Sequence, residues 1–223
     1  MHYAYLDAGG AAPNVVQSHA ALLYAIRAPE ISEVRSVLDR VLDIAKGAAL
    51  ICGTSVEPQI VSAYANTLSC PSFSELAYEC LCDAASGVSY TDEERAYAAE
   101  FVKAGSTPDA KEPIVTRVER PEEARMGAST DVGDVSWLVP TQNIYVTAFA
   151  AGTGLHTWPA VAQGRSSIAK KGMHTASRAL AGMALRLLND AELREKIKRD
   201  FEAAKAGRTY QTLIPDSVKP GMF

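Results

Sequence analysis

Short apolar stretches separated by loop signals characterise the start of the chain. Residues 3–8 and 20–28 are rich in Tyr, Leu, Ile and Ala, a composition that favours β-strands. The run from Gly9 to Asn14 between them combines Gly, Pro and Asn, which is typical of a loop. The pattern therefore predicts two strands joined by a connection that begins at two glycines.

The hydrophobic period then changes from that of a strand to that of a helix. Between Ile31 and Ala45, apolar residues recur at spacings of three and four, so this segment predicts an amphipathic helix that ends near Gly47. Residues 54–64 again favour a strand. The first 66 residues thus predict a strand–strand–helix–strand unit.

Capping patterns mark the next two helices. Ser72 with Glu75, and Thr91 with Glu94, have the spacing of the capping box, in which two side chains satisfy the first free N–H groups of a helix. Each pair precedes apolar residues at helical spacing. We therefore expect one helix to begin at each pair.

The middle of the chain is less regular. Residues 104–125 are polar and contain three prolines, so they predict an irregular connection with one short strand near 114–118. Residues 132–139 and 144–148 are apolar enough to be buried strands. Residues 152–156 are rich in Gly and predict a loop.

Two helices and an extended tail complete the predicted elements. Residues 166–188 form a long Ala-rich stretch with helical periodicity. Asn189 and Glu192 make a third capping box before an amphipathic segment that ends at Gly207. The two prolines between there and Phe223 predict an extended tail.

Composition narrows the functional classes. The 223 residues are 48% hydrophobic and 22% charged, with a formal net charge of −4 and the two signs interspersed. Nucleic-acid binding needs clustered cations, so we expect no nucleic-acid partner. No apolar run has the roughly 20 residues that span a bilayer, and no secretory signal is visible, so we expect a cytoplasmic protein without a membrane partner. The four cysteines show no metal-binding spacing, which favours buried, reduced thiols.

Five stretches of the sequence resemble a known family. They read GAAPNVV at residues 10–16, YAIRAP at 24–29, GASTDVGDVSWLVPT at 127–141, GTGLHTW at 152–158 and QGRSSIA at 163–169. Together they are similar to the M20 metallopeptidase superfamily of amidohydrolases, most closely to its aminobenzoyl-glutamate hydrolase branch. The resemblance covers nearly the whole chain.

This resemblance implies an α/β (α+β) fold in two parts. Residues 1–66 are similar to the second half of a ferredoxin-like lid domain, which usually mediates dimerisation in the family. Residues 67–223 are similar to the C-terminal part of a zinc-exopeptidase-like α/β sandwich. The implied partners are a small-molecule amide substrate and a second copy of the chain, or a different chain, bound through the lid.

His156 is the strongest candidate for chemistry. It follows a Gly-rich loop that can present an imidazole, although a lone loop histidine is more often an ordinary surface residue. The resemblance implies that it is the last ligand of a binuclear Zn²⁺ or Mn²⁺ site. Gly154 departs from the family branch, which often has Pro there.

Asn14 and Arg27 form the second candidate pair. Arg27 is the only charge in an apolar strand, and a guanidinium with a nearby amide can hold a carboxylate. The resemblance implies that this pair binds the substrate carboxylate, while a surface salt bridge is the alternative for Arg27. Asp131 and Asp134 are candidates for either the metal-site segment or loop stabilisation. His2 is expected to be a surface or packed histidine, and His174, inside the Ala-rich stretch, is expected to be a packed one.

The sequence does not contain the whole family site. The Cys-x-His or His-x-Asp metal motif and the paired-Glu motif with its general base are absent from residues 1–223, so no catalytic base is assigned. Catalytic zinc needs about three protein ligands. Three interpretations follow: a hydrolase of N-acyl amino acids, a non-catalytic or split chain that needs a partner, and an oligomerisation or ligand-binding module.

Overall fold

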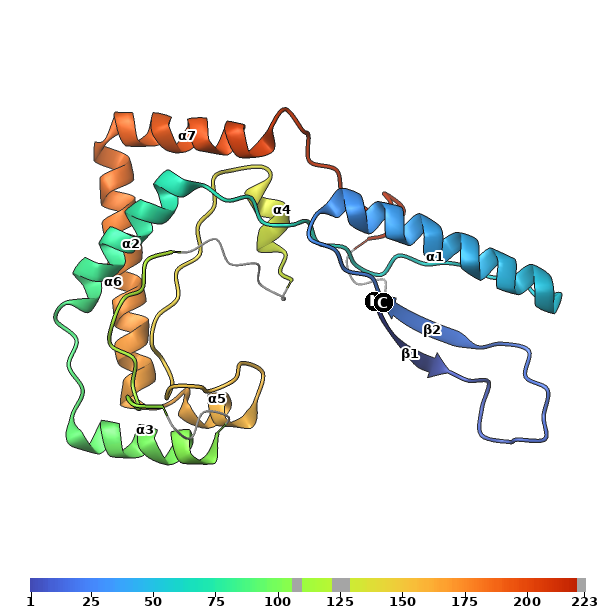
Figure 1. Cartoon of the computed structure of the whole chain (residues 1–223), viewed down its shortest axis with the longest axis horizontal. Coiled ribbons are helices and arrows are strands. Elements are labelled where there is room, and N and C mark those ends of the chain that lie inside the picture. The colour runs from blue at the N-terminus through green and yellow to red at the C-terminus, as the bar shows by residue number, and fades with distance from the viewer. Residues whose placement is uncertain (106–109, 122–128, 220–223) are drawn as a thin grey trace. The chain divides into compact units, whose positions relative to one another are not determined.

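A computed structural model describes residues 1–105, 110–121 and 129–219. It divides into two compact units (Figure 1). Unit 1 contains the described residues of 1–67, 125–138 and 209–223, and unit 2 contains those of 68–124 and 139–208. The described elements are helices with a small sheet. The sandwich-plus-lid architecture and the division into 1–66 and 67–223 stay predictions.

The two N-terminal strands form an antiparallel ribbon in unit 1. β1 (His2–Asp7) pairs with β2 (Ala21–Ala25), and Tyr3 lies opposite Tyr24 with the two rings stacked 5.8 Å apart. The register shifts by one residue between Tyr5 and Asp7. Both strands lie within or close to the predicted ranges.

Helix α1 (Ile31–Cys52) follows the ribbon and runs further than predicted. The expected apolar positions of this helix are half-buried and most other residues of it are exposed; the half-buried positions are Ile31, Val34, Leu38, Val41, Leu42 and Ala45. The predicted end at Gly47 is wrong, because a glycine inside a helix costs only about 1 kcal/mol relative to Ala. The helix ends instead at Gly53, whose φ of +64° lets the chain turn out of the helix.

Residues 132–136 form the short helix α4 (Val132–Ser136), so the predicted strand at 132–139 is wrong. Asp134 accepts a hydrogen bond from the Ala65 N–H at 3.2 Å, and the Trp137 indole donates to the Asn66 carbonyl at 2.8 Å. Residues three apart share one face of a helix but opposite faces of a strand. Only the helical form lets both side chains reach the same backbone segment.

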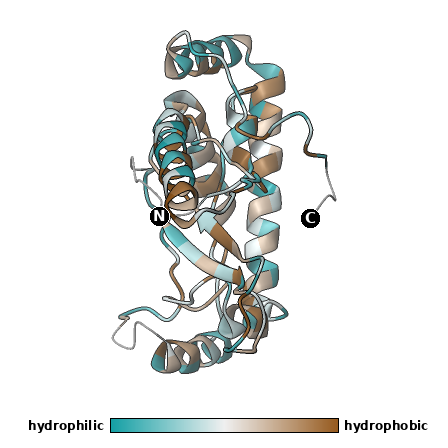
Figure 2. Ribbon diagram, turned by 90° about the vertical axis from the view of Figure 1, so that its right-hand side faces the viewer, coloured by the Kyte–Doolittle hydropathy of each residue, from teal (hydrophilic) through white to brown (hydrophobic). Residues whose placement is uncertain are grey.

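Unit 2 is built on two long helices that lie side by side. α2 (Pro71–Ala85) packs along α6 (Ser167–Asn189), and α7 (Ala191–Lys205) contacts both. Figure 1 shows α3 (Asp92–Ala104) and the short α5 (Trp158–Gln163) near the other end of α6. The ribbon of α6 carries both brown and teal positions in Figure 2, as expected for a helix buried on one face.

Buried apolar side chains form two clusters in this unit. One joins α2, α6 and α7, and the other joins α3, α6 and the segments near Ile114 and Ala150. The buried members are Cys70, Leu76, Ala77, Cys80, Met183 and Ile197 in the first cluster, and Ala98, Val102, Ile114, Ala150 and Ile168 in the second. The thiols of Cys70 and Cys80 are buried as expected, whereas Cys52 is exposed.

The predicted capping box of Thr91 and Glu94 is confirmed. The Glu94 carboxylate also forms hydrogen bonds outside the cap. Glu94 accepts from the Thr91 N–H at 2.8 Å, from the Ser167 hydroxyl at 2.6 Å and from the Lys171 ammonium at 2.6 Å. It therefore links the start of α3 to the first turns of α6. Burial raises the pKa of Glu94, but these three donors outweigh it and lower the pKa to about 2.

The other two predicted caps are wrong. Ser72 lies inside α2, where its hydroxyl and its N–H both donate to Asp200 of α7. The N-cap of α7 is Asp190, one residue after Asn189, and it accepts from the Leu193 N–H at 2.9 Å. Both carboxylates satisfy free N–H groups at a helix start more strongly than a neutral cap does.

Three predicted strands, at 54–64, 114–118 and 144–148, are irregular in the structure. The Thr147 hydroxyl donates to the Val115 carbonyl at 2.7 Å, so the second and third segments do meet. A strand forms only with a neighbour that completes its ladder. In the described part of the chain, β1 and β2 alone make such a pair.

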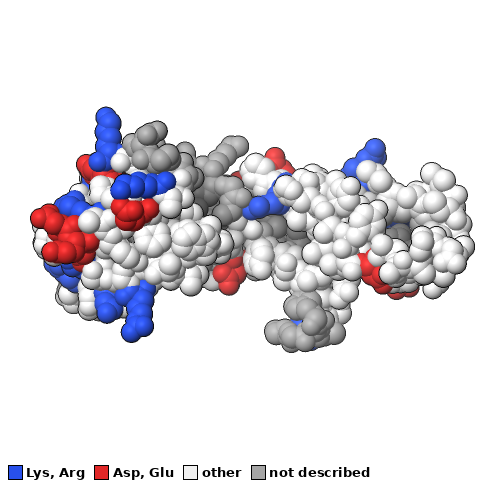
Figure 3. All heavy atoms as spheres, turned by 90° about the horizontal axis from the view of Figure 1, so that it is seen from below, with Lys and Arg blue, Asp and Glu red and all other residues white. Residues whose placement is uncertain are grey.

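Charged groups are distributed without a field of one sign on the face shown in Figure 3, where basic and acidic side chains lie next to one another. Among the described residues, none of the helices has the length and apolar character that crossing a membrane requires. The expectations about nucleic acid and location in the cell stay predictions.

Two glycines predict opposite effects of the same substitution. A Cβ at Gly133 would lie 2.0 Å from the Ala65 carbonyl oxygen, so Gly133→Ala should destabilise unit 1 by about 1–3 kcal/mol. A Cβ at Gly47 would meet nothing within 4 Å, so Gly47→Ala should stabilise α1 by about 0.5–1 kcal/mol. Urea unfolding of both variants measures the two changes in the free energy of unfolding. Equal changes in the two variants would contradict the conclusion that the two glycines differ in packing.

Glu94 predicts a pH-dependent loss of stability. Its folded pKa of about 2 lies below the ordinary value of 4.5, so its contribution is present above pH 4.5 and is lost as the pH falls toward 2. Glu94→Gln should therefore lower the melting temperature at pH 7 and should differ less from the wild type near pH 3. Thermal unfolding at both pH values tests this. Glu100→Gln, at an exposed ion pair on the same helix, is the control.

Candidate functional site

His156 lies at the centre of a tight turn in unit 2. Its φ is +60°, a left-handed conformation that residues other than Gly rarely adopt, and its side chain is exposed. The turn is closed by the Thr157 hydroxyl, which donates to the Gly154 carbonyl at 2.6 Å. Such backbone strain is found preferentially at functional sites, so the geometry favours a functional role for His156 independently of its residue type.

One further residue organises this turn, although its surroundings in the sequence do not single it out. Gln163, at the end of α5, is 1% exposed and hydrogen-bonds to three positions around the turn. Its only signal in the sequence is its place at the start of the last family-like stretch. A single glutamine at the end of a short segment does not by itself indicate burial.

The residues around His156 do not make a metal site by themselves. Among the described residues, no group of three or more His, Cys, Asp or Glu side chains could hold an ion. Catalytic zinc needs about three protein ligands, and one imidazole does not meet that need. The described residues therefore do not fit a metal ion alone, and no chemical step is assigned to one.

Arg27 lies just after β2 in unit 1 and is exposed to solvent. Its guanidinium donates one long hydrogen bond, 3.5 Å to the Ser129 hydroxyl. No carboxylate of a described residue lies within ion-pair distance of it. The surface salt bridge that was the alternative for Arg27 is therefore absent from the described residues.

Asn14 lies in the loop between the strands, beside the turn in which the Val15 N–H donates to the Ala12 carbonyl. Its amide is exposed, and no hydrogen bond joins it to Arg27 in the structure. The two residues belong to the same unit. Joint binding of one ligand by Asn14 and Arg27 stays a prediction.

The two aspartates near α4 have different environments. Asp134 accepts from the Ala65 N–H and, at 2.8 Å, from the Tyr210 hydroxyl, so it has the loop-stabilising role considered for this pair. Asp131 is exposed, and its carboxylate accepts a 3.3 Å bond from the Thr130 hydroxyl. Burial, followed by the bond to Asp134, raises the pKa of Tyr210.

Neither of the other two histidine candidates gains a role in the structure. His174 is exposed on α6, so the expectation that it is a packed histidine is wrong. His2 lies on β1 opposite Ala25 and is also exposed.

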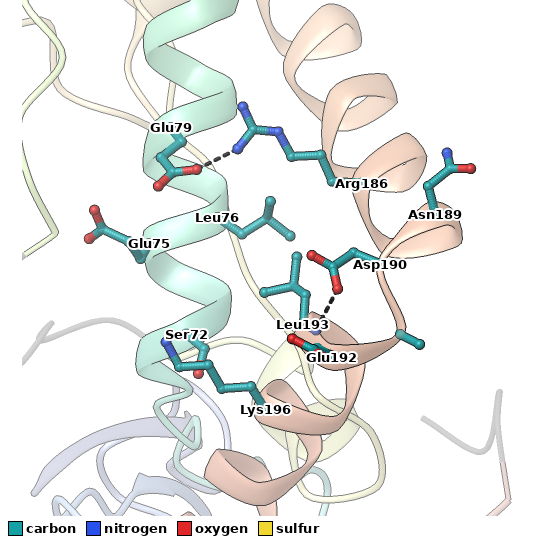
Figure 4. Close-up of a pocket in the computed structure, with 11 residues that line it drawn as sticks. Ser72, Glu75, Leu76, Glu79, Arg186, Asn189, Asp190, Glu192, Leu193 and Lys196 are labelled. Carbon is teal, nitrogen blue, oxygen red and sulfur yellow. Dashed lines mark hydrogen bonds and ion pairs between the residues drawn. The ribbon is translucent and has the colours of Figure 1, made fainter.

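A surface hollow lies where α2, the end of α6 and the start of α7 meet (Figure 4). Four of its six charged side chains already have structural partners. Arg186 pairs with Glu79 and Asp83, Glu75 pairs with Arg120, and Asp190 caps α7. Because these contacts account for most of the charges without a ligand, we assign no site here.

Comparison with known proteins adds an independent line of information. No known family model matches the sequence. The chain is 34% identical to a subunit of the p-aminobenzoyl-glutamate hydrolase of Escherichia coli (strain K12), over 99% of its own length and 51% of that protein. It is 25% identical to the Xaa-Arg dipeptidase of Mus musculus, over 87% of its own length and 38% of that protein.

The chain thus spans about half the length of the first relative and less of the second. One relative is named a hydrolase and the other a dipeptidase, and together they suggest an M20-like chain. The activity of the whole protein is therefore treated as a proposal.

The absence of a three-ligand cluster among the described residues predicts weak metal binding by residues 1–223 alone. Mn²⁺ prefers oxygen and imidazole ligands to thiolates, so it avoids interference from the four cysteines. Titration followed by electron paramagnetic resonance should show nearly all added Mn²⁺ free at micromolar protein concentration. Tight binding of two Mn²⁺ per chain would contradict this assignment, and His156→Ala would then show whether the imidazole takes part.

Proposed function

We propose that the chain belongs to the M20 amidohydrolases and acts in the hydrolysis of an amide bond in N-acyl amino acids, such as aminobenzoyl-glutamate or a small dipeptide. The observation that carries this proposal is the similarity to a hydrolase subunit over 99% of the chain. Arg27, an exposed arginine that forms no ion pair with a described residue, supports it from the structure.

The names of the two relatives point to a shared chemical feature. Aminobenzoyl-glutamate and an Xaa-Arg dipeptide both have an amide bond whose nitrogen belongs to an amino acid with a free α-carboxylate. Their side chains carry opposite charges, so the α-carboxylate is the common anionic group. A guanidinium binds a carboxylate through two parallel hydrogen bonds, and we assign this role to Arg27 with Asn14 as an additional donor.

His156 is proposed as one ligand of a Zn²⁺ or Mn²⁺ centre. His156 lies in a left-handed turn with its side chain exposed, so further ligands can reach the imidazole. Further ligands and a general base are needed beside it, because no group of three or more His, Cys, Asp or Glu side chains among the described residues could hold an ion.

A second candidate follows from the same observations. The first relative is named as a subunit, and the described residues hold no complete metal site. The chain is then a partner-dependent or non-catalytic component that binds the acyl amino acid and associates through its N-terminal unit. Ligand binding without hydrolysis by the purified chain favours this candidate, and hydrolysis by the chain alone excludes it.

Arg27 provides the test of substrate recognition. Arg27→Ala should weaken the binding of aminobenzoyl-glutamate by at least about tenfold, because hydrogen bonds to a charged group contribute about 1.5–3 kcal/mol. Arg27→Lys keeps the charge but loses the two-pronged geometry, so it should recover only part of the affinity. Isothermal titration calorimetry with the 223-residue chain measures both.

Arg35→Ala is the matched control, because Arg35 is an exposed arginine of α1 in the same unit. It should leave the affinity unchanged. A ligand whose carboxylates are converted to amides should bind the wild type no better than the Arg27→Ala variant. Equal binding of aminobenzoyl-glutamate by wild type and Arg27→Ala would refute the assignment of Arg27.

A further inference from the structure

Gln163 is a fully buried amide whose hydrogen bonds all go to the segment that contains His156. Its Oε1 accepts from the Ala150 N–H at 2.7 Å. Its Nε2 donates to the Thr153 hydroxyl at 3.0 Å and to the Pro159 carbonyl at 3.1 Å. A buried amide is costly unless its donors and acceptor are satisfied, and here they are satisfied by one short stretch of chain.

The residues that Gln163 contacts lie before and after His156 in the sequence. Thr153 lies three residues before the histidine and Pro159 three residues after it, so both ends of the turn are tied to the same side chain. Between these ties His156 adopts its left-handed conformation. A non-glycine residue keeps such a conformation only when its surroundings hold the backbone in place.

The amide group is what this arrangement needs. One end of the side chain must accept from a backbone N–H while the other donates to a hydroxyl and to a carbonyl oxygen. Only an uncharged carboxamide supplies an acceptor and two donors at once. A hydrophobic side chain of the same length would fill the space but would leave the Ala150 N–H and the Pro159 carbonyl without these bonds.

We infer that Gln163 is a positioning residue that fixes the turn and thereby the direction of the His156 imidazole. It acts through the Ala150 N–H and the Thr153 hydroxyl before the turn and the Pro159 carbonyl after it, rather than on a ligand. The inference depends on the proposed function only for what His156 binds. The effect on the turn itself is a property of residues 150–163 and is measured without metal or substrate.

The test uses the 223-residue chain with ¹⁵N-labelled histidine. The His156 imidazole resonances are assigned by comparison with His156→Asn, and amide hydrogen exchange reports the backbone of residues 151–157. Gln163→Met keeps the length of the side chain and removes its hydrogen bonds. Thr153→Val removes one of the three bonds at a half-buried position and serves if the first variant folds poorly.

Thr175→Val is the matched control. Thr175 is also buried in unit 2, but its hydroxyl bonds to the Lys171 carbonyl within α6, away from the turn. It should lower stability without affecting residues 151–157. This control separates a general loss of stability from a specific loss of the turn.

We expect Gln163→Met to shift the His156 resonances toward those of a disordered peptide and to speed exchange at residues 151–157 by at least about tenfold, the factor for losing one or more net hydrogen bonds. Thr153→Val should shift both in the same direction by a smaller amount. Unchanged His156 resonances and exchange in both variants would overturn the inference, as would equal changes in Thr175→Val. Neither result bears on Arg27, so failure here is distinct from failure of the proposed function.

Discussion

Backbone groups in the irregular segments of this protein need hydrogen-bond partners, and side chains supply them where no strand does. In the described part of the chain, β1 and β2 form the only ladder. Asp134 and Trp137 therefore bind the backbone of residues 65–66, and Gln163 binds the turn around His156. Each of these side chains is a buried or half-buried polar group whose hydrogen-bond partners lie in one specific stretch of chain. These bonds hold that stretch in one conformation.

The same principle explains which elements could be predicted from the sequence. Local signals were sufficient for the β1–β2 ribbon, the apolar face of α1 and the capping box at Thr91, because turn residues, periodicity and capping act within a few residues. They failed for residues 132–139, where an apolar run suits a helix as well as a strand. The outcome there depends on contacts of Asp134 and Trp137 with residues distant in sequence.

The residues of the candidate site also divide into those that the sequence indicates and those that only the structure reveals. His156 and Arg27 became candidates largely through the resemblance to the M20 superfamily, since a lone loop histidine is by itself more often an ordinary surface residue. Gln163 was missed because its importance comes from burial and from three partners in a folded turn. Whether a carboxylate of a described residue lies near Arg27 is likewise a tertiary property, because it is not predictable from spacing alone.

A chimera tests the central claim most directly. The segment of the Escherichia coli relative that matches this chain is replaced by residues 1–223, and release of glutamate from aminobenzoyl-glutamate is measured under conditions in which the relative itself is active. The account predicts hydrolysis that is abolished by His156→Ala and strongly weakened by Arg27→Ala. A chimera that is folded and monodisperse but inactive, beside an active parent, would contradict the account.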